Sequence, residues 1–150
     1  MSTIKQQLHS RCLTYIEERI KGASQAIQFA QGSANEETKS SAGDKYETGR
    51  AMAQLEIEKN NMQLVEAQKL KQTLLQLDST KVSETVHAGS LVITNQGRYY
   101  VSVPAGQFAI DGENYFAVSP SSPIARILLG LKVGDLASFN KKEFIVQSVL

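Results

Sequence analysis

The chain has 150 residues, with 16 Lys and Arg against 15 Asp and Glu, and a net charge of +1. This balance argues against an independent nucleic-acid binder, which usually carries a marked basic excess. The single cysteine, Cys12, excludes an internal disulfide framework, and no apolar run approaches the roughly 20 residues of a membrane span or forms a signal core. We therefore expect a cytoplasmic protein.

The first predicted element is a long amphipathic helix that begins at Ile4. Its apolar residues recur at steps of three and four, the spacing of one helix face. Over about 30 residues, roughly 45 Å of helix, they form one stripe made of Ile4, Leu8, Cys12 or Leu13, Ile16, Ile20, Ala23, Ile27 and Ala30.

A second helix is predicted over residues 44–77, after a polar, breaker-rich turn at residues 32–43. Its stripe is less regular than the first, with an uneven step after Val65, and consists of Met52, Leu55, Met62, Val65, Leu70, Leu74 and Leu77. Because each stripe is narrow, the two helices are expected to pack on each other. Residues 1–78 are therefore predicted to form an antiparallel coiled-coil hairpin with an acidic tip near residues 35–48.

The pattern changes to short strands in residues 79–150, the second predicted domain. Strands are indicated at residues 91–94, 98–103, 108–110, 115–118, 136–139 and 143–149. With one short helix among them, they predict a small α+β domain with a mostly antiparallel sheet. Its core is expected to include the aromatic side chains Tyr99, Tyr100, Phe108, Tyr115 and Phe116.

The short helix has clear start and stop signals. Ser122 can cap the first turn, Pro123 suits the first helical position, and Gly130 suits a left-handed residue after the end. Between these signals, one apolar face is expected, made of Ile124, Ile127, Leu128 and Leu131.

The chain resembles the Gre-type transcript-cleavage factors of bacterial RNA polymerase at several segments. The matching residues are Gly89-Ser90-Leu91-Val92, Ser122-Pro123-Ile124-Ala125-Arg126, Leu128-Leu129-Gly130, Val133-Gly134-Asp135 and, at the tip, Gly43-Asp44-Lys45-Tyr46-Glu47. The resemblance implies a coiled-coil hairpin before an FKBP-like sheet domain. It further implies an elongation factor whose tip enters the polymerase secondary channel and stimulates cleavage of backtracked RNA.

The tip departs from the family pattern in two respects. The family usually has Ser-Glu-Asn or Lys-Glu-Asn where this chain has Lys45-Tyr46-Glu47, and the turn is expected to be longer, with an extra acidic pair at Glu36 and Glu37. Two alternatives therefore stay open. One is a polymerase-binding inhibitor or modulator without cleavage activity, and the other is a coiled-coil interaction module unrelated to transcription.

Asp44 and Glu47 lie three residues apart, so at the start of a helix their carboxylates point to one side. By resemblance, both are metal-assisting residues that act in trans. They would add oxygen ligands for the Mg²⁺ of the polymerase, which activates a water for attack on RNA. A capping box explains the same spacing without any metal. Lys39, Lys45 and Arg50 are candidate RNA contacts, although scattered basic residues usually form a solvated face.

The resemblance also implies a docking surface around the short helix, made of Ser119, Pro120, Ser121, Pro123, Ile124 and Arg126. The implied partner is bacterial RNA polymerase, with indirect contact to the RNA 3′ end, no DNA binding alone and no membrane. The protein is expected to be a monomer that holds no cofactor alone and has no active site of its own. Cys12 and His9 lack a third polar partner for an acyl-transfer site, and Cys12 is expected to be a packed small residue. Two histidines with one cysteine make no zinc site.

Overall fold

The computed structural model describes the backbone of residues 3–39 and 43–150 and the side chains of residues 3–32 and 48–150. Internal contacts divide the chain into two units. One joins Met1–Tyr15 to Gln72–Leu150, and the other is Ile16–Lys71. The unit that holds the sheet therefore also contains the beginning of the first helix. The predicted boundary between residues 78 and 79 stays a prediction.

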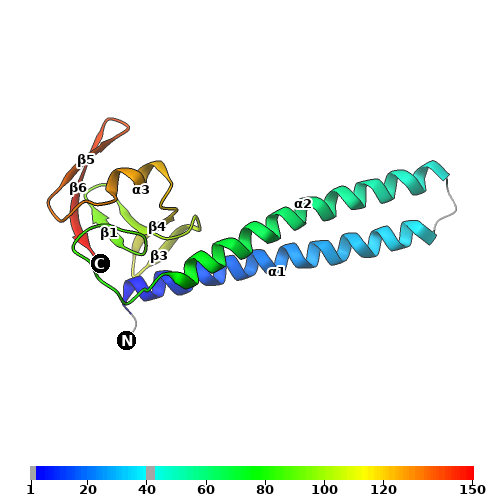
Figure 1. The fold of residues 1–150 in the computed structure, drawn as a ribbon, viewed down its shortest axis with the longest axis horizontal. Helices are drawn as coiled ribbons and strands as arrows, with labels where there is room; N and C mark the ends of the chain where they lie inside the picture. The colour runs from blue at the N-terminus through cyan, green and yellow to red at the C-terminus, as the bar shows by residue number, and fades with distance from the viewer. Residues whose placement is uncertain (1–2, 40–42) are drawn as a thin grey trace. The chain divides into compact units, whose positions relative to one another are not determined.

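The N-terminal half consists of two long helices, α1 (Ile4–Lys39) and α2 (Gly43–Gln76), which lie side by side in antiparallel directions (Figure 1). The predicted start at Ile4 and the predicted apolar stripe of α1 are confirmed. Ile4, Leu13, Ile20 and Ile27 are half-buried, and the fully buried members of the stripe are Leu8, Cys12, Ile16, Ala23 and Ala30.

The predicted turn at residues 32–43 is wrong for most of its length, because α1 continues to Lys39. Glu36 and Glu37 therefore belong to a helix and do not lengthen the turn. Ala, Glu and Lys are strong helix formers, whereas one glycine in a helix costs only about 1 kcal/mol relative to alanine. The helix therefore extends through Gly32, a position where an added Cβ atom would meet no other atom within 4 Å.

The predicted seam of α2 is wrong in its N-terminal part. Met52, Leu55, Met62 and Val65 are 62%, 59%, 75% and 49% exposed. The seam instead repeats every seven residues at Ala53, Asn60, Ala67 and Leu74, all of them buried, with Ile57 and Leu64 half-buried between them.

Hydropathy favours Leu, Met and Val over Ala and Asn, yet the residues buried in this part of α2 are the small Ala53 and Ala67 and the polar Asn60. The one amide in this seam has a partner, because Asn60 Nδ2 donates to the carbonyl oxygen of Glu56 at 2.8 Å. The prediction holds further along α2, where Leu74 is buried and Leu70 is half-buried, and beyond its end at the half-buried Leu77.

The C-terminal half is α+β. Its six strands are β1 (Leu91–Thr94), β2 (Arg98–Val101), β3 (Gly106–Ile110), β4 (Glu113–Val118), β5 (Leu136–Phe139) and β6 (Lys142–Val149), in the spatial order β3-β4-β2-β1-β6-β5. All neighbouring pairs are antiparallel except β2 and β4, which are parallel. The expected α+β domain with a mostly antiparallel sheet is therefore confirmed. After β2 the chain first forms the edge strand β3, and a two-residue turn with positive φ at Asp111 and Gly112 then returns β4 alongside β2.

The short helix α3 (Pro123–Leu128) confirms the predicted signals. Its cap is Ser122, whose Oγ accepts the amide of Ala125 at 3.3 Å, and Gly130 has φ +84°. Ala125 and Leu128 are buried in one core with Val86, Val92, Val101 and Val146, so α3 packs on the central strands of the sheet. The other members of the predicted face, Ile124, Ile127 and Leu131, are half-buried against this core.

Candidate functional site

The predicted acidic tip coincides with the start of α2. Because α2 begins at Gly43, Asp44 is its second residue and Glu47 its fifth, and Asp44 falls inside the helix, not at the N-cap position where the capping alternative places it. Lys39 is the last residue of α1, and Lys45 is in the first turn of α2. The side chains of these four residues lie outside the described part of the chain. Arg50, which the structure does describe, is exposed.

The predicted docking residues come together at the N-terminal end of α3. Ser121, Pro123 and Arg126 are exposed, and Ser119, Pro120 and Ile124 are half-buried. Hydrogen bonds hold the turn before the helix in a defined shape. Ser122 Oγ donates to the Ser119 carbonyl at 2.6 Å, and the Ser119 and Ser121 hydroxyl oxygens lie 2.9 Å apart. This surface is therefore pre-organised by its own turn.

A shallow groove of about 450 Å³ adjoins this turn, and the sequence interpretation missed it. It is mostly apolar and is lined by Pro104, Gly106, Gln107, Phe116, Ala117, Val118, Ser119 and Ser122. The expectation that Phe116 belongs to the core is wrong, because its side chain is 37% exposed. The alternation of β4 could have revealed this. Tyr115 and Ala117 are buried on one face, so Phe116 between them faces the other side.

The other four aromatic side chains expected in the core are all at least half-buried. Tyr100 and Tyr115 are buried, and Tyr99 and Phe108 are half-buried. The Tyr99 ring stacks on Phe116 with centroids 5.8 Å apart. Tyr99 and Phe116 are register partners in β2 and β4 and therefore lie on the same face of the sheet.

The start of α1 is joined to the sheet domain by a buried lysine. Lys5 is only 4% exposed, and its Nζ donates to the carbonyl oxygens of Lys81 at 2.6 Å and Leu150 at 3.2 Å. Burial lowers the pKa of Lys5, while the nearby Asp78 carboxylate opposes that shift. A buried ammonium needs such partners, so these two bonds anchor the first turn of α1.

One turn further along α1, His9 contacts the sheet. Its Nδ1 lies 2.8 Å from the hydroxyl of Tyr100, which is fully buried and whose pKa is raised by burial. The neutral phenol can therefore donate to a neutral imidazole.

Cys12 lies one turn further along α1 and is also fully buried. Burial raises the pKa of its thiol to about 11, while the Ser102 hydroxyl opposes this rise. The thiol is therefore protonated at neutral pH, and the prediction that Cys12 is a packed residue is confirmed.

The His9 contact predicts a pH dependence of stability. Burial lowers the pKa of His9, opposed by Asp78 and reinforced by Lys5, so its folded pKa lies below the unfolded value of about 6.5. The unfolded chain then binds more protons, and stability falls as the pH drops from above about 6.5 through the folded pKa. We expect the urea midpoint to fall over this window and His9→Gln to flatten the profile. An identical slope in wild type and His9→Gln would assign the pH dependence to other groups.

Among the described residues, no helix is long and apolar enough to cross a membrane. Residues 3–32 and 48–150 also contain no group of three or more His, Cys, Asp or Glu side chains placed to hold a metal ion.

Comparisons with known proteins give one structural likeness. No protein-family model matches the sequence, and no curated protein matches it. A solved structure described as "Structure of the transcription factor Gfh1" is similar to 91% of this chain over 92% of its own chain, at 20% identity and a TM-score of 0.39. At this level of similarity, family membership is not established.

Proposed function

We propose that the protein is an accessory transcription factor of bacterial RNA polymerase that stimulates cleavage of backtracked RNA. The carrying observation is the position of the acidic motif. Asp44 and Glu47, which match the family pattern, lie within the first five residues of α2, next to the point where the chain reverses between two helices of more than 30 residues. A narrow helical pair of this kind can carry two carboxylates into a channel that a globular domain cannot enter.

The reaction belongs to the partner. Mg²⁺ requires near-octahedral oxygen coordination, and two carboxylates three residues apart do not supply it alone. They do fit as additional oxygen ligands to an ion that the polymerase and the RNA phosphate already hold. That ion lowers the pKa of a bound water. Asp44 and Glu47 add negative charge and ligand oxygens there, and Lys39, Lys45 and Arg50 contact RNA phosphates.

Docking is assigned to the surface around α3. Hydrogen bonds within its own turn hold Ser119, Ser121 and Ser122 in place, which reduces the conformational entropy lost on binding. Exposed Ser121 and Pro123 lie at the start of the helix, and the neighbouring groove presents the exposed ring of Phe116. A partially exposed aromatic ring beside polar groups is a common anchor in protein interfaces.

The deciding experiment uses a stalled, backtracked elongation complex and reads RNA length and polymerase association together. We expect the wild-type protein to bind and to shorten the transcript. Tight binding without shortening would replace this proposal with the inhibitor or modulator alternative. Absence of binding would support the other alternative, a coiled-coil interaction module unrelated to transcription.

The docking surface has its own test. Pro120→Ala combined with Ser121→Asp is expected to weaken polymerase binding by about tenfold, because a charge enters the interface and the turn loses rigidity. Binding is measured by titration, with circular dichroism as the check on folding. Ser138→Asp, which adds the same charge to an exposed serine of β5, is the matched control. Equal affinity of the double variant and this control would move docking to another surface.

A further inference from the structure

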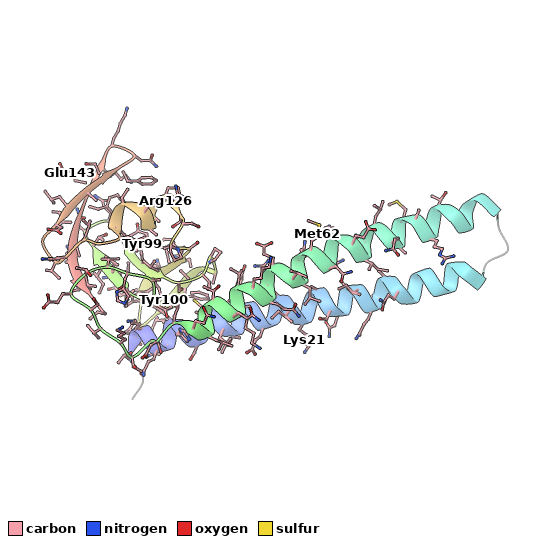
Figure 2. All side chains as sticks on the ribbon, viewed as in Figure 1. Lys21, Met62, Tyr99, Tyr100, Arg126 and Glu143 are labelled. Carbon is pink, nitrogen blue, oxygen red and sulfur yellow. The ribbon has the colours of Figure 1, made fainter. Side chains whose placement is uncertain are left out.

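The α2 helix carries a second, partly apolar stripe that no part of the described chain covers. It runs in steps of four and three residues, with Ala51, Leu55, Met62 and Val65 as its apolar members and Glu58 and Lys69 as charged members. Leu55, Met62 and Val65 are 59%, 75% and 49% exposed. At about 100° per residue, Leu55 and Met62 lie across the helix from Ala53 and Asn60, which face α1. Figure 2 shows Met62 on the side of α2 away from α1. Two sides of one helix therefore carry stripes at heptad spacing, and within the described residues only the stripe that faces α1 is buried.

The exposed seam contains a hollow shaped for another helix. Its volume is about 410 Å³, and it is lined by Asn61, Met62, Val65, Glu66 and Lys69. Four of these residues stand at i, i+3, i+4 and i+7, the set that forms the hole for one side chain of a facing helix in knobs-into-holes packing. The hollow therefore indicates a helical partner.

The charges along the seam indicate which helix fits. When a second α2 lies antiparallel with Met62 opposite Val65 of the second copy, Glu58 falls opposite Lys69 of that copy. Lys59 and Glu66, on the same edge of the seam, then also meet as opposite charges. By two-fold symmetry every pair occurs twice. A parallel pairing in register would instead place Glu58 against Glu58 and Lys69 against Lys69 of the second copy, which is unfavourable.

We propose that this face of α2 binds the same face of a second copy of the chain, in antiparallel orientation, with Met62 and Val65 at the centre and the charged pairs on either side. The inference uses only the exposed seam and does not depend on the proposed role in transcription. It replaces the expectation of a monomer with a reversible dimer whose interface is the outer face of the helical pair.

The test measures the mass of the full chain by sedimentation from about 10 μM to about 1 mM, a range that captures moderate affinities. A concentration-dependent rise from monomer to dimer is expected. Met62→Lys should weaken association by about a hundredfold, because a charge replaces an apolar contact at two symmetric positions. Phe29→Lys is the matched control, since Phe29 is 78% exposed but lies on α1, outside the seam.

Charge exchange tests the orientation. Lys59→Glu and Glu66→Lys should each weaken self-association by about tenfold, because each turns two attractive pairs into repulsive ones. The double variant Lys59→Glu/Glu66→Lys should regain dimerisation. An equimolar mixture of the two single variants should form mixed dimers, because each variant complements the other.

Several results would overturn the proposal. A monomer over the whole range would remove it, as would a dimer that Phe29→Lys weakens as much as Met62→Lys does. Failure of the mixed single variants to associate would exclude the antiparallel register. Circular dichroism confirms that each variant keeps its helices, so a loss of association is not mistaken for a loss of fold.

Discussion

Asp44→Asn is expected to lower stimulated RNA cleavage by about a hundredfold or more while polymerase binding is retained, since a charged ligand at a metal is worth several kcal/mol. Asparagine keeps the size and hydrogen-bonding capacity of aspartate and removes only the charge. Asp44 is the second residue of α2, so a structural role alone predicts only a small loss of helix-dipole stabilisation and almost no loss of cleavage. The assay is transcript shortening at fixed Mg²⁺ with saturating protein. Glu47→Gln should act in the same direction with a smaller effect.

A matched control removes an acid elsewhere at the tip. Glu37 lies near the end of α1, and Glu37→Gln changes the net charge by the same amount as Asp44→Asn. Its cleavage should equal that of the wild type if position matters more than charge. Equal losses in both variants would reduce the role of Asp44 to general electrostatics. Full cleavage by Asp44→Asn would leave Asp44 with a structural role in the first turn of α2.

The largest expected effect on stability is at Leu128. Its side chain is fully buried where α3 meets the central strands, in one core with Val92, Val101 and Val146. Leu128→Ala should lower the free energy of unfolding by about 3 kcal/mol, because it removes buried methyl groups and leaves a cavity. Urea denaturation of the full chain measures the change in the free energy of unfolding. The unfolding of the sheet domain is followed by the fluorescence of its tyrosines.

The neighbouring residue gives the comparison. Leu129 is 36% exposed and lies just after α3, so Leu129→Ala should cost about 1 kcal/mol or less. Losses of similar size in the two variants would mean that α3 does not pack through Leu128 as described. A small loss in both would indicate that the core tolerates collapse around the cavity.

Local chemistry explains which elements could be predicted. The α1 stripe and the capped α3 helix were predictable because their signals lie within a few residues of one another, as with Ser122, Pro123 and Gly130. The turn between Asp111 and Gly112 is another local feature, since both residues tolerate positive φ. At the tip, the sequence predicted Asp44 and Glu47 as neighbours, and the start of α2 at Gly43 puts them in one turn. Their chemical roles stay predictions.

The α2 seam could not be predicted because the helix has two apolar stripes of similar spacing. Hydropathy prefers the stripe with Leu55, Met62 and Val65, whereas the pairing with α1 uses Ala53, Asn60 and Ala67. Seam choice depends on how closely two backbones approach, and that distance is a property of the pair, not of either helix. The same limit applies to the groove beside α3, since Phe116 and Ser119 adjoin it only once β4 lies next to β3.

The sequence by itself determined the order and type of most elements, the start of α1, the capping of α3 and the coincidence of an acidic motif with the reversal of the hairpin. These follow from hydrogen bonding and side-chain periodicity over one or two helical turns. Only the tertiary structure decided which face of α2 is buried, that β4 runs parallel to β2, and that Lys5 and His9 hold the first turns of α1 to the sheet. Such contacts join residues as far apart as Lys5 and Leu150, and no local pattern encodes which distant group will satisfy a buried charge.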